Sequence, residues 1–231
     1  MRSAKGKLIS VVIPTLNEGR NIRKVITEVR KVLSSSRYEI IVVDGHSSDN
    51  TVEIARENGA TVIYDNQGKG SALIKGLKAA KGDILISLDA DLSTDPKEMG
   101  MLIKGITRGY DVCMGSRFMA GGSSEDISQV RRIGNLFFVT LVNHLFGSNY
   151  SDMCYGYRSF RKGVLRKLGL KEKGFGIETE ISIKAVKNGL KVLEVPSIEK
   201  KRVAGEAKLR TFRDGYVILS TIIKNLGSGS S

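Results

Sequence analysis

The 231-residue sequence is poor in several residue types: it has no tryptophan, three prolines and two cysteines, and 6% of its residues are aromatic. Cys113 and Cys154 form at most one disulfide, and without a signal peptide they are more simply reduced thiols of a cytosolic protein. No apolar run approaches the roughly 20 residues that a transmembrane helix needs. We therefore expect a chain that does not span a membrane.

Acidic residues are also scarce, since 24 Asp and Glu face 37 Lys and Arg, which gives a formal net charge of +13. Such an excess predicts an acidic partner: a nucleic acid, a phosphorylated substrate or an anionic membrane surface. Few aromatic residues are interleaved with the basic ones and no nucleic-acid-binding motif is present, so we expect no nucleic-acid partner. The first apolar run is followed by Pro-Thr-Leu-Asn-Glu and not by a glycine-rich turn, which excludes a nicotinamide-dependent dehydrogenase.

Strand and helix signals alternate over residues 8–110. Apolar, β-branched runs occupy Leu8–Ile13, Tyr38–Val43, Ala60–Tyr64 and Asp83–Leu88, and helical spacing occupies Asn21–Leu33, Thr51–Asn58 and Ser71–Ala80. We expect Pro14 to end the first strand. Strands separated by helices of about ten residues predict βαβ units and a mostly parallel sheet.

The second half is less regular. We expect strands at 111–115 and 191–195, a mobile loop at 118–128, helices at 130–146, 163–168, 178–188 and 216–223, and a basic segment at 200–213. The length predicts one large domain with a substantial core. The Gly- and Ser-rich residues 227–231 are expected to be a linker or an added tail, and membrane helices after Leu226 remain an open question.

Asp89 and Asp91 are the most informative residues, because they follow a buried strand directly. Residues two apart in an extended chain project to the same side, so both carboxylates can reach one divalent cation. Such a cation takes oxygen ligands and keeps positions for water or phosphate. Asp95 precedes a proline and is explained as a helix cap, which leaves the Asp89–Asp91 pair for a metal holding a diphosphate.

Polar residues follow other strands as well, at Asn17, Glu18 and Asp44. Open α/β sheets bind ligands outside the carboxyl ends of their strands. The acidic residues at three strand ends are therefore expected to share one site.

A series of short motifs resembles family 2 glycosyltransferases. In chain order the motifs are Ile13–Glu18 (IPTLNE), Ile41–Thr51 (IVVDGHSSDNT), Gly68–Leu73 (GKGSAL), Leu88–Leu92 (LDADL), Gly115–Phe118 (GSRF), Asp152–Arg158 (DMCYGYR) and Arg202–Leu209 (RVAGEAKL). The resemblance covers residues 8–213 and is strongest to the polyprenyl-phosphate sugar synthases, such as dolichyl-phosphate mannose and glucose synthases. Each motif is weak alone, but seven in the expected order are specific.

The resemblance implies the nucleotide-sugar-binding fold called GT-A: an α/β domain over residues 1–226 with a Rossmann-like first half and a mostly parallel sheet flanked by helices. It implies a nucleotide-binding half at about 8–110 and an acceptor-binding half at about 111–226. The expected nucleotide-binding residues are Pro14, Leu16, Glu18, Asp44, Lys69, Asp89, Ala90 and Asp91, with Asp89 and Asp91 holding Mg²⁺ or Mn²⁺. The expected acceptor- or phosphate-binding residues are Arg117, Arg131, Arg202, Lys208 and Glu178.

Two positions depart from the family pattern. Gly45 follows Asp44 where a second acid is common, which leaves the recognition of the nucleobase open. Ser93 stands where glutamine is common, which leaves a metal-water ligand in doubt.

The reaction expected from the resemblance is inverting transfer of a hexose from GDP-mannose, UDP-glucose or UDP-N-acetylglucosamine to a polyprenyl phosphate. A phosphomonoester is already anionic at neutral pH, because its second pKa is about 6, so a strong general base is not obligatory. The catalytic candidates are Asp89, Asp91, Arg117 and Asp152. Asp152 is either a base or the residue that orients an arginine.

A polyprenyl acceptor implies contact with a membrane surface from the cytoplasmic side, of the cell membrane or of the ER in a eukaryote. The apolar segments 133–146 and 216–226 are candidates for that contact, and the alternative is that they belong to the core. A rival reaction is transfer to a sugar or protein hydroxyl. That reaction needs a carboxylate base, for which Asp152 and Glu178 are the candidates.

Overall fold

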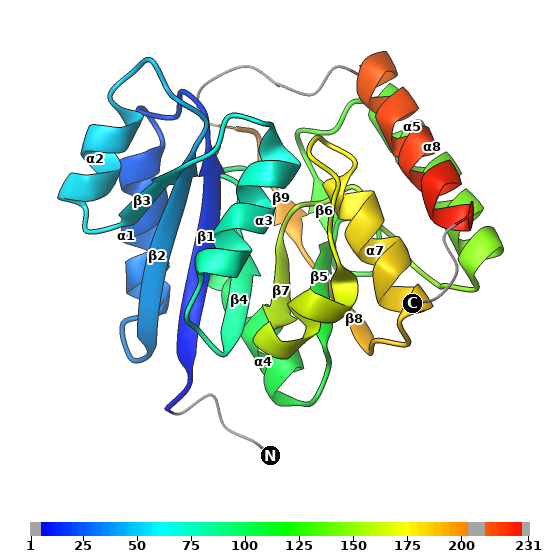
Figure 1. The fold of residues 1–231 in the computed structure, drawn as a ribbon, viewed down its shortest axis with the longest axis horizontal. Coiled ribbons are helices and arrows are strands. Elements are labelled where there is room, and N and C mark those ends of the chain that lie inside the picture. The colour runs from blue at the N-terminus through cyan, green and yellow to red at the C-terminus, as the bar shows by residue number, and fades with distance from the viewer. Residues whose placement is uncertain (1–5, 203–210, 228–231) are drawn as a thin grey trace.

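The computed structural model describes residues 6–202 and 211–227 (Figure 1). Lys208 lies outside the described residues. Helices pack on both faces of one sheet, and strands from both halves of the chain belong to that sheet. This arrangement confirms the expected α/β class with a mostly parallel sheet.

The main sheet has seven strands in the spatial order β3-β2-β1-β4-β7-β5-β8. They are β1 (Leu8–Thr15), β2 (Arg37–Asp44), β3 (Thr61–Tyr64), β4 (Ile84–Ser87), β5 (Val112–Ser116), β7 (Arg158–Arg161) and β8 (Val192–Pro196). Six of them run parallel, and β7 is antiparallel to both of its neighbours. Two short strands, β6 (Ser123–Ser124) and β9 (Ile198–Glu199), pair separately.

The helices are α1 (Ile22–Val32), α2 (Thr51–Glu57), α3 (Lys69–Ala79), α4 (Met99–Thr107), α5 (Gln129–Phe146), α6 (Leu165–Leu168), α7 (Ile177–Lys187) and α8 (Thr211–Gly227). Single 3₁₀ turns precede α4 and α6, at Pro96–Glu98 and Lys162–Val164. In α1 the buried residues Ile22, Val25, Ile26 and Val29 recur at helical spacing, so one apolar stripe faces the sheet.

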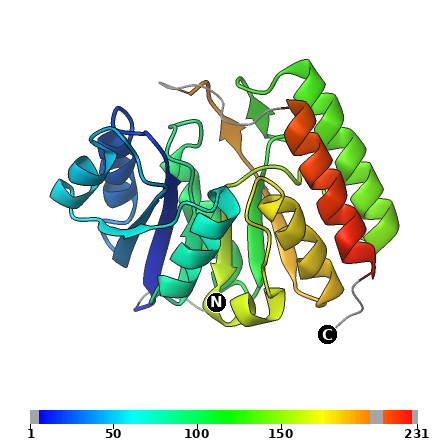
Figure 2. The same cartoon turned by 45° about the horizontal axis from the view of Figure 1, so that its top comes forward.

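Successive side chains of each strand point to opposite faces of the sheet, so the core has one layer on each face. In β1, Val12 packs with α3 and α7, whereas Val11 and Ile13 pack with α1 and α4 on the opposite face. The α5 and α8 helices lie side by side at the edge beyond α7, as both ribbon views show (Figure 1 and Figure 2).

Two expectations about the strands were wrong. β1 continues to Thr15 instead of ending at Pro14; its pairing with β4 ends at Val12, so Pro14 pairs with β2 alone. β7 was not expected, because its sequence Arg-Ser-Phe-Arg has no apolar run.

The segment 118–128 was expected to be a mobile loop, but part of it forms a short strand and hydrogen bonds. Ser123 and Ser124 form β6 against β9, and the Ser124 hydroxyl accepts a hydrogen bond from Ile127 N at 3.0 Å. Among the described residues, no helix combines the length and the apolar character needed to cross a bilayer.

Candidate active site

A cavity of about 470 Å³ opens at the carboxyl ends of the parallel strands. One end is formed by residues that follow β1, β2 and β3 and by the start of α3. The middle contains the segment after β4 and Glu178 of α7, and the far end lies against α5 and α8. This is the edge at which open α/β sheets bind ligands, and it brings together most of the residues expected from the sequence.

Most of the expected nucleotide-binding residues line this cavity: Pro14, Leu16, Glu18, Lys69, Asp89, Ala90 and Asp91. Asp44 is placed differently. It is fully buried, and its carboxylate accepts hydrogen bonds from Thr15 Oγ1 at 3.3 Å and from Ser47 N and Oγ at 2.8 and 2.5 Å. In this structure Asp44 shapes the turn after β2 and does not itself line the cavity.

Lys69, the first residue of α3, forms ion pairs with two carboxylates. Its ammonium lies 3.0 Å from Asp89 Oδ1, 3.1 Å from Asp89 Oδ2 and 3.1 Å from Glu178 Oε1. Burial by itself would lower the pKa of Lys69, but the charges of Asp89 and Glu178 outweigh burial and raise it above its usual value. The side chain therefore stays protonated.

Asp91 lines the cavity, and both of its oxygens have neighbours. Its Oδ1 accepts a hydrogen bond from Ser93 N at 3.0 Å, and its Oδ2 lies 3.8 Å from Arg202 Nη1. Asp89 and Asp91 fit a hard divalent cation, because both are carboxylates at the cavity and Asp89 already attracts a cationic group. No cluster of three or more His, Cys, Asp or Glu suited to a metal occurs in the described part of the chain.

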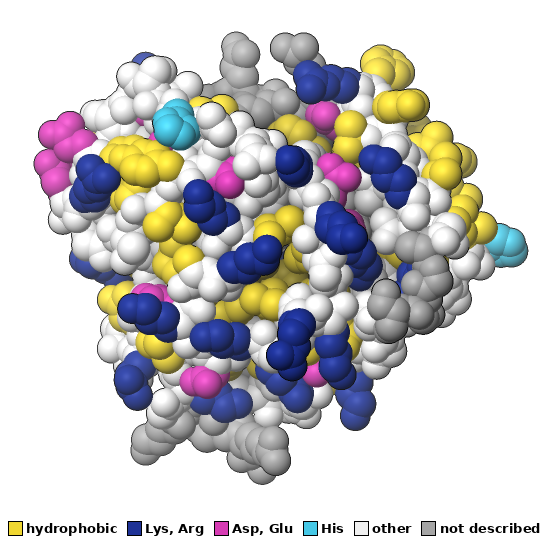
Figure 3. Space-filling model, in the orientation of Figure 1, with side chains coloured by type: hydrophobic (Ala, Val, Ile, Leu, Met, Phe, Trp, Pro, Cys, Tyr) yellow, Lys and Arg dark blue, Asp and Glu magenta, His cyan; other side chains and the backbone are white. Residues whose placement is uncertain are grey.

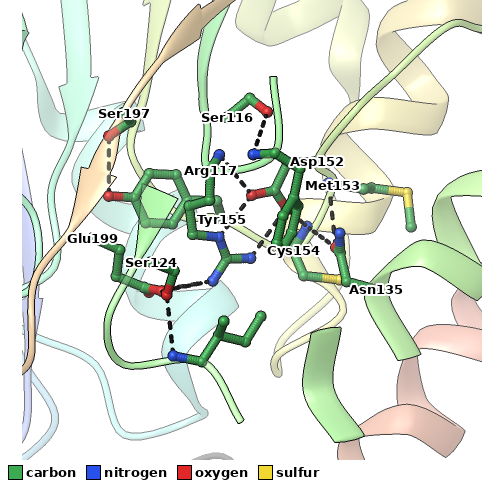
Figure 4. Close-up of polar contacts among 12 residues, drawn as sticks. Ser116, Arg117, Ser124, Asn135, Asp152, Met153, Cys154, Tyr155, Ser197 and Glu199 are labelled. Carbon is green, nitrogen blue, oxygen red and sulfur yellow. Dashed lines mark hydrogen bonds and ion pairs between the residues drawn. The ribbon is translucent and has the colours of Figure 1, made fainter. Parts of the chain in front are cut away.

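Arg117 is held between two carboxylates (Figure 4). Its Nε and Nη2 donate to Asp152 at 2.7 and 3.1 Å, and its Nη1 donates to Glu199 at 3.1 and 3.2 Å. The guanidinium also lies over the ring of Tyr155, 4.8 Å from its centroid. Burial would lower the pKa of Arg117, but the two carboxylates raise it, so the cation is permanent.

The side chain of Asp152 is fully buried and accepts two hydrogen bonds from the Arg117 guanidinium. Of the two roles left open by the sequence, this placement favours the orientation of an arginine. Arg117 lines the cavity wall with a side chain that is 7% exposed, so it presents little of its charge to a ligand.

Arg131 and Arg202 both line the cavity, and Arg202 lies 3.8 Å from Asp91. Arg131 lies in the first turn of α5, where its backbone N donates to the capping Ser128 side chain at 3.4 Å. Arg202 Nη2 lies 2.6 Å from Asp126 Oδ2, and this hydrogen bond raises the pKa of Arg202 and lowers that of Asp126. Both arginines therefore bring positive charge to the cavity.

The cavity residues that sequence reasoning missed include Glu199, Asp126 and Asn135. Glu199 lies in the two-residue strand β9 and Asp126 in the loop before α5, and neither segment is long enough to show a periodic signal. Asn135 did carry a signal, since it is a polar residue within an apolar helix. It is buried, and its Oδ1 accepts hydrogen bonds from the backbone N of Met153 and Cys154 at 3.5 and 3.3 Å.

The far end of the cavity lies between α5 and α8 and is mostly apolar. Gly134 and Phe138 of α5 and Gly215 and Ile218 of α8 line it, together with the buried carboxylate Asp214 of α8. Outside the cavity these helices expose large apolar side chains, with exposures of 68% for Ile133, 64% for Leu136, 58% for Phe137, 90% for Phe212 and 74% for Tyr216. Apolar side chains gather along the α5–α8 edge in the space-filling view (Figure 3). The expected helix at 130–146 is therefore part core, through Val139 and Val142, and part surface.

Comparison with known proteins gives three findings. Residues 10–169 match the family described as glycosyl transferase family 2. The chain is 35% identical over 210 residues to the dolichol-phosphate mannosyltransferase of Pyrococcus furiosus, covering 87% of this chain and 59% of the relative. It is 32% identical over 217 residues to the dolichyl-phosphate hexose transferase of Haloferax volcanii, covering 94% of this chain and 92% of the relative.

The fold has a solved counterpart in glucosyl-3-phosphoglycerate synthase from Mycobacterium tuberculosis, crystallised with Mn²⁺, uridine diphosphate and glucosyl-3-phosphoglycerate. The TM-score is 0.77 at 22% identity, over 100% of this chain and 84% of that chain. At this identity the likeness concerns the fold. The chain also spans less than two thirds of the length of the Pyrococcus relative.

Proposed function

Because the chain belongs to glycosyltransferase family 2, we propose that it transfers a hexose from a nucleotide sugar to a polyprenyl phosphate of the dolichyl type. The observation that carries this proposal is the composition of one cavity, which joins an acidic pair, two arginines and an apolar end. A diphosphate with its cation, an acceptor phosphate and an apolar tail need these three surfaces in this order. The names of the two relatives support the same acceptor class.

The donor end is proposed to hold the nucleotide between Pro14, Leu16 and the start of α3. Asp89 and Asp91 would hold Mg²⁺ or Mn²⁺, which supplies charge neutralisation of the departing nucleoside diphosphate when bound. Lys69 adds a permanent positive charge beside the same group. The structural neighbour crystallised with Mn²⁺ and a nucleotide supports this assignment.

The acceptor phosphate is proposed to bind Arg131 and Arg202. The planar guanidinium binds phosphate through two hydrogen bonds and remains charged. An anionic phosphate needs no strong base, so the protein's task is to hold two anions together and to aim one at the anomeric carbon. Attack opposite the leaving group inverts that carbon, and an α-linked donor then gives a β-linked product.

The alternative acceptor, a sugar or protein hydroxyl, requires a general base at the cavity. Both candidates for that base are already engaged, since Asp152 is paired with Arg117 and Glu178 with Lys69. This pairing argues for the phosphate acceptor.

We further propose that the chain works at a membrane surface, on the cytoplasmic side of the cell membrane or of the ER membrane in a eukaryote. The exposed apolar residues of α5 and α8 adjoin the apolar end of the cavity, so an acceptor tail passing between these helices enters lipid directly. Replacing Ile133 and Phe137 by serine is expected to weaken co-sedimentation with vesicles of anionic lipid. The matched control is Met101→Ser, which removes an exposed apolar side chain from α4.

The test of the proposed reaction uses radiolabelled GDP-mannose, UDP-glucose and UDP-N-acetylglucosamine with a short polyprenyl phosphate and Mg²⁺ or Mn²⁺. We expect one lipid-linked product, which names the donor, and we expect its loss in Asp91→Asn. Glu53→Gln, an exposed carboxylate on α2, is the matched control and should remain active. Transfer to a sugar hydroxyl without transfer to the lipid phosphate would refute the proposal.

A further inference from the structure

Lys69 is the counter-ion of Asp89, one of the two residues proposed to hold a metal ion. Its ammonium is 3.0 and 3.1 Å from the two carboxylate oxygens of Asp89, so one cation is shared by both oxygens. A divalent ion held by Asp89 would have to compete with this ammonium for the carboxylate. Asp89 therefore already has a counter-ion in this structure.

A second carboxylate holds Lys69 from the other side. Glu178 Oε1 is 3.1 Å from the ammonium, and Glu178 is 4% exposed in the first turn of α7. A buried carboxylate without a cation is strongly disfavoured, so Glu178 keeps Lys69 nearby even when the contact with Asp89 is lost. The ammonium can thus turn away from Asp89 while it remains paired.

We propose that Lys69 is a positioning residue that blocks metal binding at Asp89 until a diphosphate arrives. This inference rests on the proposed function, because the diphosphate is that of the nucleotide sugar. When the diphosphate binds, the Lys69 ammonium turns toward its oxygens and remains on Glu178, and Asp89 becomes available to the metal. Donor and metal then bind together, and neither binds well alone.

The local charges favour joint binding. A divalent cation alone would bring two positive charges next to the Lys69 ammonium and within reach of Arg202, which lies 3.8 Å from Asp91. The diphosphate of a nucleotide sugar carries two negative charges. Metal and diphosphate arriving together leave the net charge of the cluster unchanged, whereas either alone changes it by two.

Gly156 leaves space for the Lys69 ammonium to move from Asp89 to the diphosphate. A Cβ at this position would lie 2.9 Å from Asp89 Oδ2 and 3.3 Å from Lys69 Nζ. The glycine therefore leaves the contact between the carboxylate and the ammonium open on one side. The backbone at this position is held by the Ser87 hydroxyl, which donates to Gly156 O at 2.6 Å.

The test is Mn²⁺ binding to the full chain without nucleotide, measured by calorimetry or by the EPR signal of free Mn²⁺. We expect Lys69→Gln to bind Mn²⁺ at least about tenfold more tightly than the wild type, because Asp89 loses its counter-ion while the amide still donates to Glu178. Glu178→Gln is expected to bind more weakly than the wild type, because Lys69 is then left to Asp89 alone. Lys78→Gln, an exposed residue of the same helix, should match the wild type.

Lys69→Gln is expected to tighten Mn²⁺ binding and Glu178→Gln to weaken it. Local damage to the site would weaken Mn²⁺ binding in both variants, so the two explanations are distinguished. Unchanged or weaker Mn²⁺ binding in Lys69→Gln would overturn the proposal. Adding UDP or GDP should tighten Mn²⁺ binding to the wild type much more than to Lys69→Gln. If neither nucleotide binds, the proposed donor class fails, while the nucleotide-free comparison still decides the role of Lys69.

Discussion

Replacing Asp152 by asparagine tests the buried ion pair that forms one wall of the cavity. The carboxylate accepts hydrogen bonds from the Arg117 guanidinium at 2.7 and 3.1 Å, from Arg117 N at 3.2 Å and from Cys154 N at 3.2 Å. An asparagine keeps one acceptor oxygen and turns an N–H group toward at least one of these donors. Arg117 then loses its most buried counter-ion.

The loss of folding stability in Asp152→Asn depends on how deeply the Arg117–Asp152 ion pair is buried. Removing one partner of a buried ion pair destabilises a protein by about 3–5 kcal/mol. Glu199 remains 3.1 Å from Arg117 Nη1, so part of the charge stays compensated and we expect the lower end, about 3 kcal/mol. Glu199→Gln removes the more exposed partner, with a side chain 12% exposed against 0% for Asp152, and should cost about 1–2 kcal/mol.

Urea unfolding followed by circular dichroism measures both variants. If Asp152→Asn lowers the free energy of unfolding less than Glu199→Gln does, burial does not set the strength of these two ion pairs. The more buried carboxylate would then contribute less than the more exposed one. Adding Arg117→Met to Asp152→Asn should recover part of the loss, since the buried cation is removed together with its partner.

The same variant separates the two roles of Asp152. If it orients Arg117, transfer falls together with stability, and the dependence of the rate on pH keeps its shape. If it were the general base, transfer would be abolished at a temperature where the variant is fully folded, and the acid limb of the pH profile would disappear with it.

Two further predictions concern single positions. Gly156→Ala should lower transfer activity and shift nucleotide-free Mn²⁺ binding, because the new methyl group lies 2.9 Å from Asp89 Oδ2; unchanged values in both assays would contradict the placement of this glycine. Burial raises the pKa of Cys113 from its ordinary value of 9.0 to about 12, so the unfolded chain loses this proton first as pH rises through 9 to 12. The free energy of unfolding should therefore fall by up to about 1.4 kcal/mol per pH unit in that window, and Cys113→Ala should show a shallower fall in urea titrations at pH 8 to 10.5.

The composition of the cavity fits the two anions of the proposed reaction. Lys69, Arg131 and Arg202 line it together with Asp89, Asp91, Asp126 and Glu178. Lys69 and Arg202 are held in place by ion pairs with Asp89, Glu178 and Asp126. Exchange of these internal partners for phosphate oxygens is the common principle behind the proposed binding of donor and acceptor.

The sequence was sufficient for features that depend on near neighbours. The alternation of strands and helices over residues 8–110 follows from local periodicity, and the structure has β1 to β4 and α1 to α3 within a few residues of the expected bounds. Asp89 and Asp91 were placed at the cavity because a buried strand ends immediately before them and parallel strands end at one edge of a sheet.

β7 illustrates what local sequence does not contain. Arg158 begins this strand and is 1% exposed, although arginine is rarely buried. Its guanidinium donates to Tyr155 O and Met153 O at 3.0 and 2.6 Å and to the Ser182 hydroxyl at 3.0 Å. These acceptors satisfy it in place of water, and their positions exist only in the folded chain.

The partners of the charged residues were likewise decided by tertiary structure. Lys69 lies 109 positions from Glu178, Arg117 lies 82 from Glu199, and Arg202 lies 76 from Asp126. A sequence with 37 basic and 24 acidic residues allows a great many pairings, and no local pattern selects among them. By itself the sequence determined the strands and helices of residues 8–110, the separate motifs of the family and the acidic pair, because each of these rests on residues close together in the chain. Which carboxylate holds which cation was decided by the packing of α3, α5 and α7 around the sheet, which brings distant side chains within hydrogen-bonding distance.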